Sequence, residues 1–480
     1  MGNTVYKAAG NIWGVKNYTD GRKAENELLA KSNNHGKMLS RAKSFARNNP
    51  FAMAAKITFE TYCGCLTPVE GYEESRVAFN EWAKRAGLES GQSLGELAAQ
   101  LVGTMTWGDC LAVLGSDPYA PPGTVSARLK LIDPLQVETP PKYKNKDIVN
   151  GKRVVLGVVL DKHDIEIGYY VRKAGTDGNN DSDFSFLPRY DKNGRFFSML
   201  VRRPGSTFPG QVRSLPMLAA AMDVIDVLDQ LIESAAIEAK TKSSLSIMLE
   251  TSLPPSDGQS WADKKEAVSE VNLPRINLDG IKSGDVASLP HGTTPHVIAN
   301  AGNLDIVEQI KQQIKLIAGS FGVPYAAMMS DFDKMSFSSS KMMMSKLYTL
   351  VDLWNYGPIM RLFNEIYKWV CFEHYLVKGI LPSNEMLVCN WVGPEQPDPD
   401  PVKSAKANEI RLRLGVENRT DIVARKGDNY EDLLEQKKKE LDMEREKFNG
   451  LTFDEVLGRS KTEDIDNSSD DEDDDKEEEE

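Results

Sequence analysis

The residues whose types suit catalysis or metal binding occur in small, isolated groups. Asp331 and Asp333 lie two residues apart in a serine-rich stretch, and such a pair of carboxylates could bind a divalent cation for a DNA-processing reaction. The same two residues could equally cap a neighbouring helix. Cys63 and Cys65 form a single Cys-Gly-Cys pair without a second matching pair nearby, so we expect buried thiols rather than a metal site.

The sequence lacks the motifs that mark the common enzymes of nucleotide and hydrolytic chemistry. It contains no G-x-x-x-x-G-K-[ST] loop for ATP, no H-E-x-x-H zinc motif and no nucleophile elbow, and its five histidines are scattered. We therefore expect a protein that is not an enzyme and that uses no cofactor and no metal. A metal-dependent DNA-processing enzyme is the alternative, and it would depend on Asp331 and Asp333.

The net charge of −13 comes almost entirely from the C-terminal end. The last twenty residues contain two lysines and thirteen acidic residues, a balance of −11, so the rest of the chain carries only −2. A nearly neutral body excludes a strong global attraction to nucleic acid or to an anionic membrane. The sequence also has no run of about 18 apolar residues, so no membrane span is expected.

The longest helix that the sequence predicts runs from Leu215 to about Ser243, with Ser214 as its cap and Pro216 in its first turn. Apolar residues repeat along one side at helical spacing. A row of carboxylates along the other side is either a solvated face or an acidic wall past which DNA slides without adhering. The row consists of Asp223, Asp226, Asp229 and Glu233.

A second helix is predicted over residues 304–318, with a buried apolar stripe. Between the two helices, residues 245–303 contain many prolines and glycines and are predicted to form an irregular protruding lobe. A serine-rich loop follows, and then a long helix over residues 340–377 that Gly357 and Pro358 should kink. Four residues in or next to this loop are Lys334, Met335, Ser336 and Phe337.

The rest of the chain predicts an α+β protein that is mainly α. Helices are expected from Met38 to Tyr62, with a break at Asn48-Asn49-Pro50, and basic residues there form either a solvated face or a phosphate contact. Further helices are expected over residues 74–86, 93–106, 400–414, 420–425 and 428–448. Short strands are expected over residues 111–114, 127–132, 154–160 and 167–171, with a polar insertion over residues 173–195.

Several short motifs occur along the chain in a fixed order and spacing. They are Arg41–Ala52, Arg203-Pro204-Gly205, Gln211–Pro216, Ile317–Pro324, Ser330-Asp331, Ser338–Lys341, Trp391–Pro394 and Asp400–Lys403. Together these motifs resemble the phage portal family of the lambda type, from a phage, a prophage or a gene transfer agent. The resemblance covers about residues 38–440, and Ser214 and Lys341 stand where the family usually shows Gly and Arg.

This resemblance implies a portal ring at one vertex of the capsid of a virion, assembled in the host cytoplasm, typically from twelve identical subunits. Double-stranded DNA would pass through its channel during packaging and ejection, without recognition of its sequence. The other implied partners are the terminase large subunit, the head-completion adaptor and the major capsid or scaffold protein. A different capsid scaffold or adaptor protein is a further alternative.

The resemblance also assigns each segment of the chain to a part of a portal subunit. Lys334, Met335, Ser336 and Phe337 would then line the narrowest part of the channel, in the tunnel loop. The assignments are an N-terminal arm (1–37), a wing (38–214), a stem helix (215–244), a clip (245–303), a second stem helix (304–324), the tunnel loop (325–339), a kinked wing spine helix (340–390), a crown-like helical region (391–450) and a disordered acidic tail (451–480).

Overall fold

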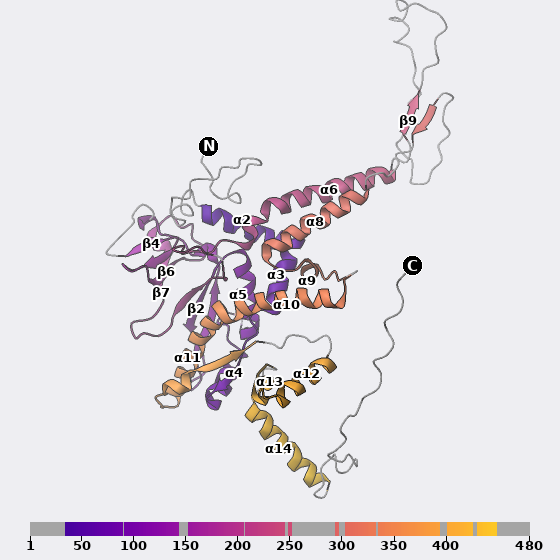
Figure 1. Ribbon diagram of the computed structural model, residues 1–480. Helices are drawn as coiled ribbons and strands as arrows, with labels where there is room; N and C mark the ends of the chain where they lie inside the picture. The colour runs from indigo at the N-terminus through magenta and orange to yellow at the C-terminus, as the bar shows by residue number, and fades with distance from the viewer. Residues whose placement is uncertain are drawn as a thin grey trace, which may run out of the picture. The chain divides into compact units, whose positions relative to one another are not determined.

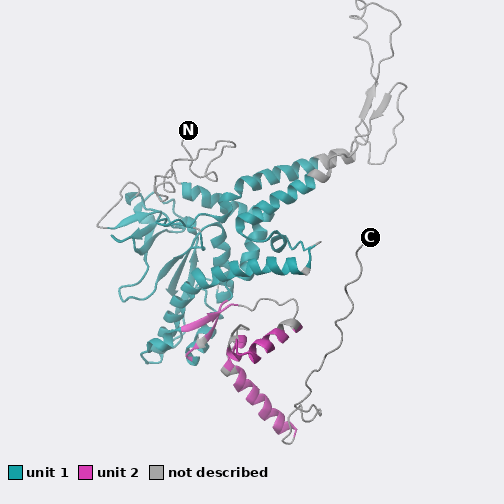
Figure 2. Cartoon of the chain, in the orientation of Figure 1, with its two compact units in different colours: residues 1–65, 73–388 teal, residues 66–72, 389–480 magenta. Residues whose placement is uncertain are grey.

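The computed structural model in Figure 1 describes residues 34–89, 91–143, 152–205, 207–244, 248–251, 293–296, 303–332, 335–393, 401–425 and 430–448. Most of the predicted N-terminal arm, most of the clip and the whole acidic tail lie outside these residues. The chain divides into two compact units (Figure 2). One unit comprises residues 1–65 and 73–388, and the other comprises residues 66–72 and 389–480.

The predicted helix break at Asn48-Asn49-Pro50 is confirmed. Helix α2 spans Asn34–Asn48 and helix α3 spans Pro50–Tyr62. The Asn49 side chain accepts hydrogen bonds from the backbone N–H groups of Phe51 (3.0 Å) and Ala52 (3.1 Å), so it caps α3. Proline fits the first position of α3 because its missing N–H would have no partner inside the helix there.

The next two helices also match the sequence prediction. Helix α4 spans Glu73–Ala83 and helix α5 spans Leu94–Trp107. Ser93 and Glu96 form a capping box at the start of α5, in which the Ser93 backbone N–H donates to Glu96 Oε2 at 2.8 Å. Helices α3 and α5 pack against each other, and their apolar sides are buried.

Two antiparallel sheets follow, with more strands than the sequence predicted. The first has the order β3-β2-β8, with β2 at Cys110–Ser116, β3 at Ala127–Ile132 and β8 at Ser198–Val201. The second has the order β4-β5-β6-β7. Its strands are β4 at Arg153–Val155, β5 at Val158–Leu160, β6 at Glu166–Arg172 and β7 at Phe184–Pro188.

The prediction of one strand over residues 154–160 is wrong, because β4 and β5 form a hairpin there. Leu156 (φ 50°) and Gly157 (φ 85°) both take positive φ values at its turn, as two-residue hairpins favour. A leucine rarely adopts this conformation, so the apolar run concealed the turn. Strands β7 and β8 were not predicted, since β7 lies inside the segment assigned to a polar insertion.

The described residues of the second unit form one strand pair and three helices. Strand β1, Thr67–Gly71, pairs antiparallel with β11, Cys389–Val392. The helices are α12 at Pro401–Arg413, α13 at Arg419–Arg425 and α14 at Tyr430–Lys447, close to the ranges predicted. Exposed charged residues dominate α14, as the sequence indicates.

A fully buried ion pair joins the helical and β parts of the first unit. The Arg213 guanidinium makes a bidentate contact with the Asp109 carboxylate, with Nε–Oδ2 at 2.7 Å and Nη2–Oδ1 at 2.8 Å. Its other N–H groups donate to the backbone carbonyls of Val137 (2.9 Å), Leu156 (2.8 Å) and Pro134 (3.0 Å). All five guanidinium donors therefore have a protein acceptor, which is what a buried arginine requires.

The segment that carries Arg213 is fixed by two more contacts. The Ser214 backbone N–H donates to Asp109 Oδ2 at 3.1 Å, and the Ser214 carbonyl accepts from His35 Nε2 at 3.0 Å. His35 belongs to α2. The Arg213–Asp109 pair and these two contacts therefore connect α2, the start of β2, the β4–β5 turn and the segment that leads to the next long helix. We call Arg213, Asp109, Ser214 and His35 the buried ionic cluster.

Replacement of Arg213 by lysine should strongly destabilise the protein. Lysine has three donors on one point charge and cannot reproduce the planar fork, so carbonyls and a carboxylate are left unpaired in the interior. We expect Arg213→Lys to lower the free energy of unfolding by about 3–5 kcal/mol, measured by urea denaturation.

Arg153→Lys is the matched control, because Arg153 pairs with Asp164 at 2.8 Å between side chains that are 40% and 69% exposed. An exposed pair of this kind is worth about 1 kcal/mol or less. Equal losses for the two variants would contradict the role of the buried ionic cluster.

Stability should also depend on pH through His35. Burial, and secondarily the Arg213 charge, lower the pKa of His35 from 6.5 to about 4. The unfolded chain therefore binds a proton between these two values that the folded chain does not, so stability is complete above pH 6.5 and falls as the pH drops toward 4. The loss from this group is about 3 kcal/mol, since one pKa unit corresponds to about 1.4 kcal/mol.

His35→Gln provides the test, because its amide can donate to the Ser214 carbonyl without titrating. Urea denaturation of both proteins from pH 7 to pH 4 should show a steeper loss in the wild type. Parallel curves would show that His35 does not titrate as the structure indicates.

Candidate functional site

The two long helices that the sequence predicts lie side by side in the structure. After a 3-10 turn at Met217–Ala220, helix α6 spans Met222–Ser244, and helix α8 spans Asn303–Phe321 and packs along α6 (Figure 1). At about 1.5 Å per residue, the 23 residues of α6 extend for about 35 Å. Between the two helices in sequence, strands β9 (Met248–Thr251) and β10 (Thr293–His296) pair antiparallel.

The start of α6 differs from the prediction. Pro216, not Ser214, holds the N-cap position of the 3-10 turn, and the α-helix begins only at Met222. The Ser214 backbone N–H and carbonyl instead bind Asp109 and His35, and the helical turn begins after Pro216.

The four carboxylates follow α6 next to its buried apolar residues, because at about 100° per residue Asp229 lies within about 40° of the buried Met222 and Ile225. Asp226, Asp229 and Glu233 are exposed and Asp223 is half-buried, whereas Met222, Ile225 and Leu228 on the same helix are buried. Partial burial, and then the negative charges of Asp223 and Asp229, raise the pKa of Asp226. The row is therefore a concentrated negative face.

The α2–α3 junction contacts the N-terminal part of this negative face. The Asn49 amide donates to both carboxylate oxygens of Asp229, each at 3.1 Å, while Asn49 also caps α3. The positive charge of Arg41 acts in the opposite direction and lowers the pKa of Asp226, which offsets part of the rise. Lys43 pairs with Asp133 and lies 5.3 Å from the centre of the Trp107 ring. Lys43 is therefore engaged in contacts within this chain. Glu233 lies one helical turn beyond Asp229.

Helix α8 buries only part of its predicted apolar stripe. Ile314 and Ile317 are buried, but Val307 is 66% exposed. Leu316, on another side of the helix, is 60% exposed. Among the described residues, the apolar stripe is therefore not covered along its whole length.

The loop that follows α8 is attached to that helix by a small polar cluster. The Tyr325 hydroxyl donates to Asp331 Oδ2 at 3.0 Å, and Lys311 Nζ of α8 lies 3.5 Å from the same oxygen. Lys311 also lies 5.6 Å from the centre of the Tyr325 ring. Asp331 thus holds the start of the loop against α8.

These contacts place Asp331 in a structural role. Asp333, its partner in the metal hypothesis, lies outside the described residues. Within the described ranges, no group of three or more His, Cys, Asp or Glu side chains is arranged to hold a metal ion. Cys63 is buried and Cys65 is exposed, and both are free thiols. None of the described helices is long and apolar enough to cross a membrane.

Helices occupy much of residues 325–339, the range predicted as the tunnel loop. Helix α9 occupies Tyr325–Met329, Ser330 ends it with a left-handed φ of 55°, and helix α10 already begins at Phe337. Between these helices the structure describes residues 330–332, 335 and 336.

Four residues were predicted to line the tunnel loop, and the structure describes two of their side chains. Met335 is half-buried, and the exposed Ser336 caps α10 by accepting from the Ser339 backbone N–H at 3.2 Å. Phe337 is the first residue of α10, but its side chain and the whole of Lys334 lie outside the described residues.

The long kinked helix is confirmed as three segments. Helix α10 spans Phe337–Trp354, a π-helical segment spans Asn355–Ile359 and helix α11 spans Met360–Val377, with a change of direction between α10 and α11 (Figure 1). Pro358 lies inside the π-helical segment, where a helix accommodates an extra residue. The buried Asn355 side chain accepts from the Gly64 backbone N–H at 2.8 Å, which fixes the bend against the end of α3.

Ser336→Ala should weaken the start of α10 because it removes the side chain that caps the helix. The expected loss is about 1 kcal/mol of unfolding free energy, measured by urea denaturation. Ser338→Ala is the matched control, since Ser338 is exposed within the first turn and does not cap the helix. Equal stability of the two variants would contradict the capping role of Ser336.

Comparison with known proteins gives consistent matches. The sequence model of phage portal proteins of the lambda family matches residues 17–354, more than half of this chain. The portal protein of Escherichia phage N15 is 21% identical over 342 residues, which cover 65% of this chain and 62% of that protein. Portal protein B of Escherichia phage lambda is 22% identical over 361 residues, which cover 67% of this chain and 64% of that protein. The chain thus spans slightly less than two thirds of the length of these curated relatives.

Solved structures give weaker likenesses. A chain in the virion of a native gene transfer agent particle aligns with a TM-score of 0.45 and 13% identity, covering 82% of this chain and 93% of that one. A portal protein of the HK97 family from Corynebacterium diphtheriae aligns with a TM-score of 0.33 and 14% identity, covering 68% of this chain and 88% of that one.

Proposed function

This chain belongs to the lambda family of phage portal proteins, and we propose from that premise that it forms a ring at one vertex of a capsid. Double-stranded DNA would pass through the channel of the ring during packaging, retention and ejection. The role is structural and not enzymatic, and it takes place in a virion or a gene transfer agent particle. Family membership carries this proposal.

The arrangement of the first unit supports the proposal. Helices α6 and α8 pack side by side, and the segment that connects them carries the β9–β10 pair. This order fits a stem formed by α6 and α8 and a clip over residues 245–303. The terminase and later the head-completion adaptor would dock on the clip.

The remaining parts follow the same assignment. We assign residues 38–214 to the wing, with the two sheets and helices α2–α5, and helices α10 and α11 to its kinked spine. The crown-like region would comprise α12, α13 and α14. These assignments also place the wing where the major capsid or scaffold protein would contact the ring.

The negative face of α6 suits the wall of a DNA channel. Duplex DNA carries a dense row of phosphates, so a ring of carboxylates repels it and limits adhesion during passage. In a cyclic ring, each exposed carboxylate is repeated once per subunit. Asp226, Asp229 and Glu233 would form successive acidic rings, although Asn49 covers part of Asp229 in each subunit.

The segment over residues 330–336, between helices α9 and α10, suits a constriction. Lys334, Met335, Ser336 and Phe337 would touch the DNA backbone at the narrowest point without reading bases. The cluster of Lys311, Tyr325 and Asp331 would hold each loop against its own stem helix. Because Ser336 caps α10, the loop and the spine helix would move together.

Ring formation is the direct test of the proposed function. Purified protein examined by mass photometry and negative-stain electron microscopy should form rings with an open axial channel. Twelve copies of the 53.3 kDa chain would have a mass of about 640 kDa. A protein that stays monomeric under all assembly conditions would contradict the proposal. A closed oligomer without an axial channel would favour another scaffold or adaptor role.

Charge reversal on α6 should make the channel adhere to DNA. A ring with Asp226→Lys and Glu233→Lys should bind duplex DNA more tightly at low salt, with a steeper loss of affinity as salt rises, because each added lysine can displace counterions from phosphates. Glu81→Lys is the control, since Glu81 is an exposed residue of α4 that pairs with Lys84, another exposed side chain. Equal DNA binding by both variants would show that this face of α6 does not form the channel wall.

The same rings allow a test of the tunnel loop. Lys334→Ala and Phe337→Ala rings should package or retain less DNA than wild-type rings. If these rings retained as much DNA as wild-type rings, the two residues would not form the constriction.

A further inference from the structure

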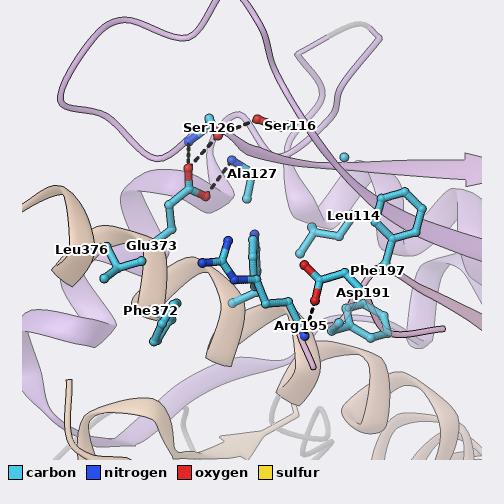
Figure 3. A pocket seen from close by; sticks show the side chains of 13 residues that line it. Leu114, Ser116, Ser126, Ala127, Asp191, Arg195, Phe197, Phe372, Glu373 and Leu376 are labelled. Atoms are coloured by element: carbon cyan, nitrogen blue, oxygen red, sulfur yellow. Dashed lines mark hydrogen bonds between the residues drawn. The ribbon is translucent and has the colours of Figure 1, made fainter. Parts of the chain in front are cut away.

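A cleft of about 280 Å³ lies between the sheet of β2 and β3 and helix α11, away from α6, α8 and the loop over residues 330–336. Its lining includes apolar residues on both sides, among them Leu114, Phe197, Phe372 and Leu376. Figure 3 shows the Arg195 side chain between these two sides. None of the functions proposed above uses this cleft.

The guanidinium of Arg195 is held by aromatic rings rather than by a carboxylate. Its Cζ atom lies 4.9 Å from the centre of the Trp369 ring and 5.7 Å from that of Phe372, distances at which a cation is attracted to a ring face. Among the residues that the structure describes, the contacts of the guanidinium are these two rings, and no hydrogen bond or salt bridge engages it. Its donors are therefore available to a ligand.

Hydrogen bonds within residues 191–195 hold the turn that carries Arg195. Asp191 Oδ1 accepts from the backbone N–H groups of Asn193 at 2.7 Å and of Arg195 at 2.9 Å. The backbone N–H of Asp191 donates in return to the Arg195 carbonyl at 2.8 Å. The turn and the stacked rings together pre-organise the guanidinium, which lowers the entropy cost of binding a ligand.

Besides Asp191, the cleft contains a second carboxylate, Glu373, which also accepts hydrogen bonds from the protein. Glu373 Oε1 accepts from the Ser126 backbone N–H at 2.7 Å and from the Ser126 hydroxyl at 2.6 Å. Its Oε2 accepts from the Ala127 backbone N–H at 3.0 Å. Figure 3 shows Glu373 turned toward these groups and Asp191 bonded to the backbone of Arg195. The cleft thus presents one free cationic fork beside two carboxylates that are bound to backbone donors.

We propose that this cleft binds a short peptide segment of a partner protein, in which a carboxylate lies next to apolar or aromatic side chains. An arginine fork matches a carboxylate with two parallel hydrogen bonds, and the apolar lining would receive the neighbouring side chain. A nucleic acid is disfavoured, because a single arginine flanked by two carboxylates cannot neutralise several phosphates. This inference does not depend on ring formation or on the DNA channel.

The proposal can be tested with a capped tripeptide that has aspartate between leucine and phenylalanine, titrated into the full-length protein by calorimetry. We expect a dissociation constant below about 1 mM, and binding at least about tenfold weaker for the same peptide with asparagine, because the charged bidentate contact is lost. This comparison uses only the wild-type protein, so it does not depend on the folding of a variant.

Two variants locate the binding. Arg195→Gln should weaken binding of the aspartate peptide at least about tenfold, whereas Lys192→Gln should leave it within about twofold. Lys192 is the matched control, because it is an exposed cation in the same turn that does not line the cleft. Thermal unfolding of the variants should match that of the wild type.

The proposal would be overturned by any of three results. These are no binding of the aspartate peptide, equal binding of the asparagine peptide, and unchanged binding by Arg195→Gln. Inorganic phosphate and a short DNA duplex serve as competitors. Displacement of the peptide by either competitor at about equal concentration would indicate a phosphate site instead.

Discussion

The first unit depends on the Arg213–Asp109 pair more than on any other interaction. A buried guanidinium is tolerated only when each of its donors finds an acceptor, and here the acceptors come from Asp109, from the segment between β3 and β4, and from the β4–β5 turn. Arg213 is also only nine residues ahead of Met222, where α6 begins. The direction in which α6 leaves the body is therefore set by a point at which helices and sheets are already joined.

This constraint links stability to the proposed function. The acidic face of α6 can serve as a channel wall only if every subunit presents it at the same angle. The contact of Asn49 with Asp229 makes a second connection between the body and α6. Lys311 of α8 pairs with Asp331 and so connects α8 to the segment that follows α9. These contacts connect the body with helices α6 and α8 and with the segment that follows α9.

Much of this fold could be predicted from the sequence, because local signals were strong. The Asn49-Pro50 cap, the capping box of Ser93 and Glu96 and the kink at Pro358 each follow from backbone chemistry within a few residues. The β4–β5 hairpin could not be predicted, since Leu156 takes a φ value that leucine seldom adopts. Ser214 was misread as a helix cap because its actual partners are 105 and 179 residues away in the chain.

The candidate site was predictable only in outline. The spacing of Asp226 and Glu233 showed that both lie on one side of a helix, but the contact of Asn49 with that face depends on tertiary structure. The cluster of Arg213, Asp109 and His35 gave no sequence signal beyond a basic residue inside a family motif. The same holds for Arg195, whose aromatic neighbours on α11 lie more than 170 residues further along the chain. Such long-range pairs are visible only once the chain has folded.

We propose that the acidic face of α6 and the loop after α9 surround passing DNA. A cryo-electron microscopy reconstruction of the DNA-containing particle at side-chain resolution would be the sharpest test. In it, Asp226 and Glu233 of every subunit should face the axis of the ring, and residues 330–336 should form its narrowest point. A reconstruction in which α6 turns these carboxylates away from the DNA, or in which another segment forms the constriction, would contradict it.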